Sequence, residues 1–297
     1  MVDLHALTET GKISTGGCIF CSEKGSGELI SCANGTSQID KIHNQVVNYF
    51  NSYKSLRADK FIAYFQNFTN TYDSIKNLKA KYDAALINPK IVGLEVATRP
   101  DCINEDIVKL LSSYKDKYYV CVELGLQTSN DDIGNFINRG YLSSSFTYAT
   151  KLLNKYGIDV VVHLMIGLPL ETFNDVKNSV DFINHHNVQG IKIHSTYVVE
   201  NTGLANLYYS GEYVPISFDY YMDCLVYVLT HINPNVVIHR IVADAPKDLL
   251  VAPSWNLHKK WVLNGLDKIM REQNLFQGMY YDLKSVSYTH LTLPTNR

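Results

Sequence analysis

Short β-rich runs alternate with amphipathic helical patterns through most of this chain. Strands that alternate with helices in this way form βαβ units, and βαβ units build a parallel sheet. The sequence therefore predicts an α/β fold. The expected strands cover residues 60–66, 90–97, 118–124, 158–166 and 190–197, and the helical patterns cover 72–85, 104–114, 143–156 and 172–186. A polar segment at 37–54 with helical apolar spacing predicts one further helix before the first strand.

The expected strands are nearly continuous in apolar residues, which is typical of parallel strands covered on both faces. Five such units, plus one whose strand before Cys18 is lost or degraded, predict a partial (β/α)6 TIM-like barrel. After residue 197 the alternation ends, and the pattern predicts a helix, a strand at 235–241 and a last helix. We therefore predict a core at residues 1–215 and a small C-terminal α+β module at 216–284.

The last segment, residues 285–297, contains VSYTHLTLPT and resembles one reading frame of a sequencing adapter. We expect this tail to be non-native and leave it out of the fold.

Cys18 and Cys21 form a C-x2-C pair in the glycine-rich stretch GGCIFCSEKGSGE, residues 16–28. Two thiolates at this spacing can bind one metal ion or one edge of a cluster, and Gly25 and Gly27 allow the backbone to approach it closely. A structural zinc site needs four ligands, and the sequence offers no matching second pair. A redox pair or two inert buried thiols are the other interpretations.

Composition limits the class of protein. The formal net charge is −2, from 27 basic and 29 acidic residues, so nothing indicates a basic nucleic-acid surface. The six cysteines are irregularly spaced, which argues against a disulfide framework and fits a reducing cytosol. No secretory signal or membrane-spanning apolar run is present. We expect a cytoplasmic protein without a membrane partner.

Polar residues gather where the expected strands end, which is where barrels carry their chemistry. Each has an ordinary structural alternative as well. Thr69 and Asn70 also suit a helix cap, and Gly167 and Pro169 also suit a plain strand-to-helix turn. Glu123 and Gln127 end a buried strand, so the Glu123 carboxylate needs a cationic or hydrogen-bonding partner.

These pieces, taken in order, resemble the radical SAM superfamily, and especially uncharacterised bacterial proteins related to the radical SAM half of the Elongator catalytic subunit. The matching segments run over nearly all of residues 11–280. They are GGCIFCSEKGSGE, YFQNFTNTY, VGLEVATRPDC, VELGLQT, NRG, HLMIGLPLET, GIKIH, VIHR, APSW and FQG.

The resemblance implies a 4Fe–4S cluster held by three cysteines and S-adenosylmethionine (SAM) bound at its open iron. Reductive cleavage of SAM then gives a 5′-deoxyadenosyl radical, with an electron donor such as flavodoxin or ferredoxin as partner. Cys18 and Cys21 match two ligands, while Ala6 occupies the position of the third cysteine. This departure suggests a truncated or chimeric start and a chain that holds the cluster poorly.

The resemblance also implies roles for the strand-end residues. It places Thr69 and Asn70 at the SAM amino group, Glu123 and Gln127 at the ribose or amino group, and Gly167 and Pro169 beside the adenine. The substrate end of the site is expected to be lined by Lys192, His194 and Arg240. His163, Cys102, Cys121 and Cys224 are interpreted as core residues, and Arg99 is expected to pair with Asp101.

The function predicted is radical SAM chemistry on an unknown substrate, for which the Elongator relationship suggests RNA. The alternative is a non-catalytic metal- or nucleotide-binding barrel. An aldolase-type barrel is disfavoured because no lysine at a strand end suits a Schiff base.

Overall fold

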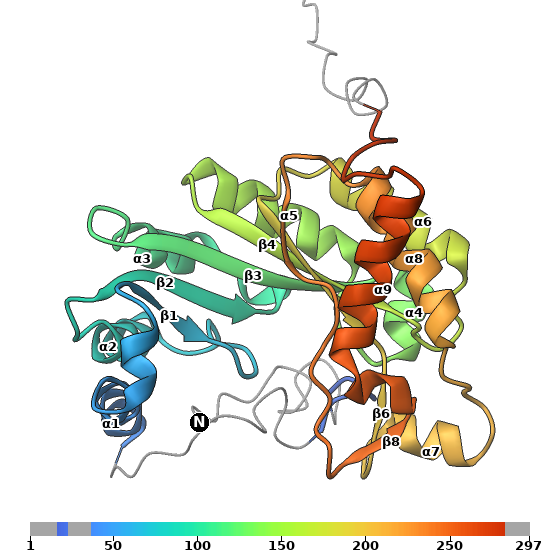
Figure 1. The fold of residues 1–297 in the computed structure, drawn as a ribbon. Helices are drawn as coiled ribbons and strands as arrows, with labels where there is room; N and C mark the ends of the chain where they lie inside the picture. The colour runs from blue at the N-terminus through green and yellow to red at the C-terminus, as the bar shows by residue number, and fades with distance from the viewer. Residues whose placement is uncertain (1–16, 23–36, 283–297) are drawn as a thin grey trace, which may run out of the picture.

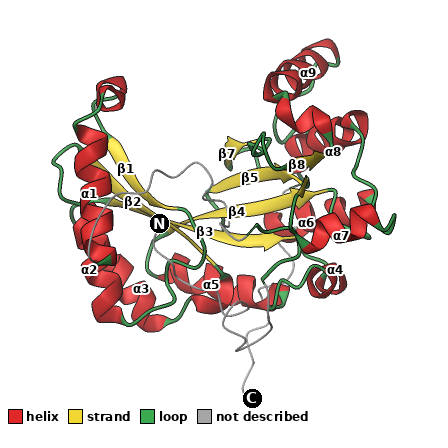
Figure 2. Ribbon diagram, turned by 90° about the horizontal axis from the view of Figure 1, so that it is seen from below, coloured by secondary structure: helices red, strands yellow, loops and turns green. Residues whose placement is uncertain are grey.

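A curled parallel sheet of six strands forms the centre of the computed structural model, which describes residues 17–22 and 37–282. The strand order is β1-β2-β3-β4-β5-β7, and every neighbouring pair in it is parallel. Figure 2 shows the sheet curved like part of a barrel wall, with helices along its outer side. The strands are β1 (Phe61–Phe65), β2 (Ile91–Thr98), β3 (Tyr119–Gln127), β4 (Asp159–Ile166), β5 (Gly190–Ser195) and β7 (Val237–Arg240).

The helices connect the strands and cover the outer face. In chain order they are α1 (Gln38–Phe50), α2 (Ile75–Ala85), α3 (Glu105–Ser112), α4 (Asp131–Phe136), α5 (Ser143–Lys155), α6 (Phe173–Asn184), α7 (Gly203–Tyr209), α8 (Phe218–His231) and α9 (Lys259–Glu272). Short 3-10 helices lie at Tyr53–Arg57, Pro100–Cys102 and Ser254–Leu257. Helix α1 packs on α2, α5 and α6 pack on β4, and α8 lies between α6 and α9 (Figure 1).

Local sequence explains where several of these helices begin. The Ser74 hydroxyl accepts a hydrogen bond from the amide of Asn77 at the start of α2, and the Asn104 side chain caps α3 in the same way. Thr172 and Asp175 form a reciprocal capping box at α6. Such caps satisfy amides that the first helical turn leaves without intrahelical partners.

The alternation of strands and helices, the parallel sheet and the partial barrel are confirmed. One strand differs from the expectation. The predicted strand at 235–241 is present as β7, but it pairs with β5 and completes the sheet, whereas we expected it in the C-terminal module. A short antiparallel pair, β6 (Val198–Val199) with β8 (Leu250–Ala252), also joins the two predicted parts. The division at residue 215 stays a prediction, and the predicted tail lies outside the described residues.

The two faces of the sheet differ in chemistry. On β4, Val160, Val162, Leu164 and Ile166 are fully buried beneath the outer helices, in one large hydrophobic core. The residues between them include His163, which faces the concave side. Burial on both faces was expected from the apolar runs, and it holds for the outer face, while the concave face carries polar side chains from several strands. None of the helices in the described part of the chain is long and apolar enough to cross a membrane.

Candidate functional site

The C-terminal ends of the parallel strands meet at one edge of the sheet, and most of the predicted site residues gather there. Glu123 does not, because β3 continues four residues beyond it to Gln127. Thr69 and Asn70 follow β1, Gln127 ends β3, and Gly167 and Pro169 follow β4. The register of β1 to β4 brings these strand ends side by side. Sequence reasoning thus selected positions that the topology brings together from three strands.

The loop after β1 contains side chains whose polar atoms are hydrogen-bonded and others whose buried polar atoms have no partner among the described residues. The Asn70 side-chain nitrogen donates to the carbonyl oxygens of Phe65 at 3.0 Å and Ala97 at 2.8 Å, so this residue ties the end of β1 to the end of β2. The Thr69 hydroxyl and both amide atoms of Asn67 are buried without a hydrogen-bond partner among the described residues. Buried polar groups are normally satisfied, so these atoms suit a bound ligand. Asn67 was not selected from the sequence, although it lies in the matching segment YFQNFTNTY.

Cys18 and Cys21 lie on a tight turn in which the Cys21 amide donates to the Cys18 carbonyl at 3.0 Å. Main-chain hydrogen bonds fix this turn on two sides. The Ile19 amide donates to the Ile137 carbonyl at 3.0 Å, and the Leu204 amide donates to the Ile19 carbonyl at 2.7 Å. The Asn138 side chain also donates to the Gly17 carbonyl at 2.6 Å. The two thiols are therefore placed between the segment after α4 and the start of α7.

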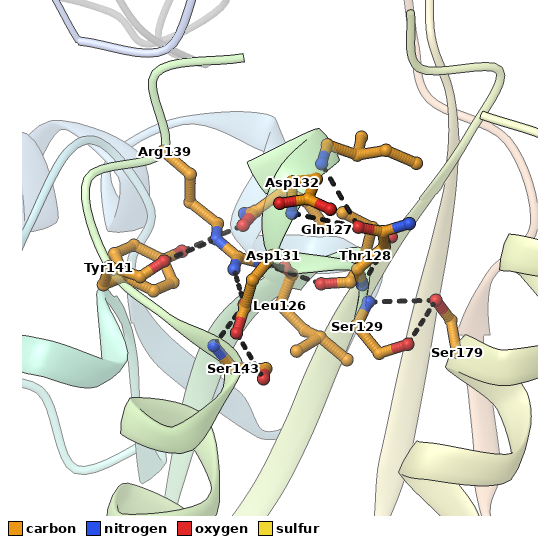
Figure 3. A network of polar contacts seen from close by, with 12 residues as sticks. Leu126, Gln127, Thr128, Ser129, Asp131, Asp132, Arg139, Tyr141, Ser143 and Ser179 are labelled. Carbon is orange, nitrogen blue, oxygen red and sulfur yellow. Dashed lines mark hydrogen bonds and ion pairs between the residues drawn. The ribbon is translucent and has the colours of Figure 1, made fainter. Parts of the chain in front are cut away.

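Arg139 organises the end of β3 (Figure 3). Its side chain is fully buried. One terminal nitrogen donates to the carbonyls of Leu126 at 2.7 Å and Thr128 at 2.6 Å, and the other donates to the Asp131 carboxylate at 2.7 Å. Asp131 in turn accepts from the Ser143 amide at 2.7 Å. The sequence offered this residue in the segment NRG, but its role depends on contacts with three separate segments.

Gln127 lies directly in this network and takes a left-handed backbone conformation, with φ of 59°. Its side-chain oxygen accepts a hydrogen bond from the Tyr141 hydroxyl at 2.9 Å. Burial raises the pKa of Tyr141, and the nearby Cys18 thiol adds to this shift. The Gln127 side chain and the cysteine turn therefore share Tyr141 as a neighbour. As expected, Arg99 pairs with Asp101, at 2.9 Å, and it lies over the Tyr141 ring.

The turn after β4 is shaped by Gly167 and Glu171. Gly167 has φ of 90°, and a side chain there would collide with Ile216, so glycine is required. The Glu171 carboxylate accepts from the Gly167 amide at 2.6 Å, while its other oxygen is buried without a partner among the described residues. Burial raises the pKa of Glu171 to about 8. Pro169 is buried in the same turn.

Glu123 points away from the outer helices and is fully engaged on the concave face. Its carboxylate accepts from the Tyr64 hydroxyl at 2.6 Å and contacts the His163 ring nitrogen at 2.8 Å. Lys192 forms an ion pair with its other oxygen. Burial acts to raise the pKa of Glu123, but hydrogen bonds and the positive charge of Lys192 hold it well below its usual value. The partner that the Glu123 carboxylate was expected to need is therefore a neighbouring lysine. His163, which we interpreted as a core residue, contacts the same carboxylate.

Comparisons with known proteins identify the family. The family model described as the radical SAM superfamily matches residues 9–183, and the model of the radical SAM C-terminal domain matches residues 188–272. The chain belongs to the radical SAM superfamily. Members of this superfamily are enzymes that carry out SAM-dependent radical chemistry, with SAM and a 4Fe–4S cluster as cofactors.

Individual relatives agree with this assignment. The uncharacterized protein YtqA of Bacillus subtilis is 33% identical over 271 residues, which cover 91% of this chain and 83% of that protein. Elongator complex protein 3 of Dictyostelium discoideum is 31% identical over 171 residues, 56% of this chain and 30% of that protein. The solved structure of archaeal Methanocaldococcus infernus Elp3 has a TM-score of 0.65 at 21% identity, over 81% of this chain and 60% of that chain.

The residues present fit the two cofactors to different extents. Asn67 and Thr69 offer buried donors and acceptors at a strand end, which fits the polar groups of SAM. Cys18 and Cys21 offer two thiolates for a cluster, but the described residues contain no group of three or more suitable metal-binding side chains. Ala6, Cys32, Gly25 and Gly27 lie outside the described residues. The described residues therefore supply two of the three cysteine ligands that hold the cluster in this family.

We predict that Arg139→Met destabilises the fold by about 3–5 kcal/mol, because it leaves Asp131 and three carbonyl groups without their buried partner. Urea unfolding measures this change. The matched control is Arg271→Met, which removes an exposed ion pair with Asp267 on α9 and should cost less than about 1 kcal/mol. A loss below about 1 kcal/mol for Arg139→Met would show that the network does not hold the site together.

We predict a pH dependence from Glu171. Its pKa is about 8 in the folded chain against an ordinary 4.5, so the folded state binds the proton more tightly. The stability that this proton contributes is complete below pH of about 4.5 and is lost as the pH rises toward about 8. Glu171→Gln should therefore gain stability relative to the parent across this interval, by at most about 1.4 kcal/mol per pH unit. Urea unfolding as a function of pH measures it, with exposed Glu272→Gln as control; parallel curves for parent and Glu171→Gln would contradict it.

Proposed function

We propose that, with a cysteine at the Ala6 position, this protein binds a 4Fe–4S cluster through that residue, Cys18 and Cys21 and uses it to cleave SAM reductively. When bound, the cluster supplies the electron that splits SAM into methionine and a 5′-deoxyadenosyl radical, which acts on a substrate. The observation that carries this proposal is the joint placement of the cysteine turn and Gln127 around Tyr141. The hydrogen bonds to Ile137 and Asn138 support it, because they attach the turn to the segment that also contains Arg139.

The SAM-binding part of the proposal rests on five positions. Thr69 contributes a buried hydroxyl without a described partner, and Gln127 contributes an amide nitrogen beside the strand end. Asn70 shapes the loop, since its amide nitrogen already binds two carbonyls. Gly167 and Pro169 form the turn expected beside the adenine.

The predicted contact between Glu123 and SAM stays a prediction. Its two carboxylate oxygens bind Lys192, Tyr64 and His163, and this engagement favours a role in holding the strands together. Glu123 is therefore a poor choice for a binding test, because its removal would leave Lys192 half-buried without its counterion.

The proposal also includes a substrate class, an electron donor and a cellular location. An RNA substrate is a prediction from the relationship to Elongator complex protein 3, and the net charge of −2 gives it no separate support. Flavodoxin or ferredoxin as electron donor, and a cytoplasmic location, are predictions of the same kind. The non-catalytic barrel is not favoured, because members of the superfamily are enzymes.

We predict that the unaltered chain takes up far fewer than four irons on anaerobic reconstitution, and that Ala6→Cys raises the content to about four. The reason is that Cys18 and Cys21 alone leave two irons of the cluster without thiolates. Iron and sulfide assays measure the difference. Cys18→Ser in the Ala6→Cys background should abolish the gain, whereas Cys102→Ala, at a buried position outside the C-x2-C pair, should not. A full cluster in the unaltered chain would show that another residue is the third ligand.

We predict that Thr69→Val and Gln127→Ala each weaken SAM binding by about tenfold in the cluster-loaded Ala6→Cys chain. Loss of one ligand hydrogen bond in a buried site typically costs about 1–1.5 kcal/mol, which corresponds to this factor. Equilibrium dialysis with labelled SAM measures the affinity, and an iron assay on the same sample separates SAM binding from cluster loading. The exposed Gln273→Ala serves as control. Unchanged SAM affinity with full iron would remove both residues from the SAM site.

A further inference from the structure

Six strands place charged and polar side chains on the concave face, and most of their charge is balanced internally. Glu123 is the centre, with Tyr64 from β1, His163 from β4 and Lys192 from β5 bound to its carboxylate. Glu95 from β2 also hydrogen-bonds with Glu123. The negative charge of Glu123 is therefore balanced by its neighbours, and its carboxylate oxygens are already hydrogen-bonded.

Glu95 adds no second negative charge at neutral pH. Burial and the adjacent Glu123 carboxylate raise the pKa of Glu95 to about 8, so its carboxyl group keeps its proton and donates it to Glu123. The Lys192 charge is matched by Glu123. The charges of Glu123 and Lys192 therefore balance each other, and Glu95 adds none.

Arg240 is a further charge on this face, at the end of the sheet opposite β1. It ends β7 and is the cross-strand partner of Lys192 on β5. Its positive charge acts on Tyr64 and His194, which both belong to the concave side. Arg240 forms no hydrogen bond or ion pair with any residue that the structure describes, and it is only half-buried. A guanidinium presents five donors in a planar fork, so an unmatched one is a strong site for anionic oxygens.

Two histidines beside Arg240 add neutral hydrogen-bonding groups. The His194 ring nitrogen Nε2 is buried without a partner in the described part of the chain. Burial, together with the positive charges of Arg240 and Lys192, holds the pKa of His194 well below its usual value, so its ring is uncharged. His239, next to Arg240, lies against Gly190 and also has a lowered pKa because of burial. These rings can donate to a ligand without repelling Arg240.

We propose that Arg240, with Lys192 and His194, binds a phosphate or carboxylate group of the substrate on the concave face. This inference rests on the proposed function and deepens it, since it gives the substrate an anionic group. The site lies below the ends of β4 and β5. Lys192 pairs with His163 three residues before those ends, and His194 pairs with Met165 one residue before them. A substrate anchored there extends from the anion toward Gln127 and the cysteine turn at the strand ends.

A purely structural role for Arg240 is the competing explanation. A structural arginine would bind the carboxylates within the cluster, as Arg139 binds Asp131 and Arg99 binds Asp101. Here Lys192 occupies that role at Glu123, and Arg240 is left over. The competing explanation predicts that removing the Arg240 charge changes stability but leaves anion binding unaffected.

The test uses the unaltered chain without iron or SAM and two probes, inorganic phosphate and acetate. Titrations followed by phosphorus and proton NMR measure saturable binding of each probe. We expect at least one probe to bind, Arg240→Gln to weaken its affinity at least tenfold, and Arg240→Lys to restore part of it. Arg271→Gln, which changes an exposed arginine on α9, should leave the affinity unchanged. A preference for phosphate or acetate identifies which anion the substrate carries.

Three results would overturn the inference: no saturable binding of either probe, equal affinity in Arg240→Gln and the parent, or competitive displacement of the probe by SAM. The last result would place Arg240 in the SAM site. Because this measurement needs no cluster, failure of iron loading leaves it interpretable. In the same way, failure of anion binding leaves the proposed SAM cleavage standing.

Discussion

The buried guanidinium of Arg139 is the interaction on which the candidate site depends. It joins the last residues of β3 to α4 and, through Asp131, to the start of α5. A buried arginine is favourable only when its donors are satisfied, and here they bind two carbonyls, a carboxylate and the Tyr141 carbonyl. The neighbouring residue Asn138 binds the cysteine turn. One charged side chain therefore sets the geometry of two parts of the site.

Most of the fold could be predicted because its signals are local. Strands such as β4 are marked by a run of β-branched residues, and helices such as α6 by a capping box and apolar spacing. The place of β7 could not be predicted in this way. It is four residues long, and its pairing with β5 is decided by the space left at the sheet edge, which no local pattern records.

The site was predictable to the extent that its residues stand at strand ends. Gln127, Gly167 and Thr69 follow directly from that rule. The partners of Glu123 were not predictable in detail, because Tyr64 and Lys192 are 128 positions apart in sequence and meet only through the curvature of the sheet. Asn67 was missed for another reason. Only the packed loop shows that its amide is buried without a partner, since an asparagine in a polar loop is ordinarily solvated.

The anchoring of the cysteine turn has a consequence for how this turn can bind a ligand. The turn is held by the main chain of Ile19 and by Asn138, and the side chains of Ile19 and Phe20 pack against small apolar clusters. None of these contacts requires a metal. The contacts that position the two thiols therefore come from the chain itself, and little further ordering of this turn is needed for a ligand to bind there.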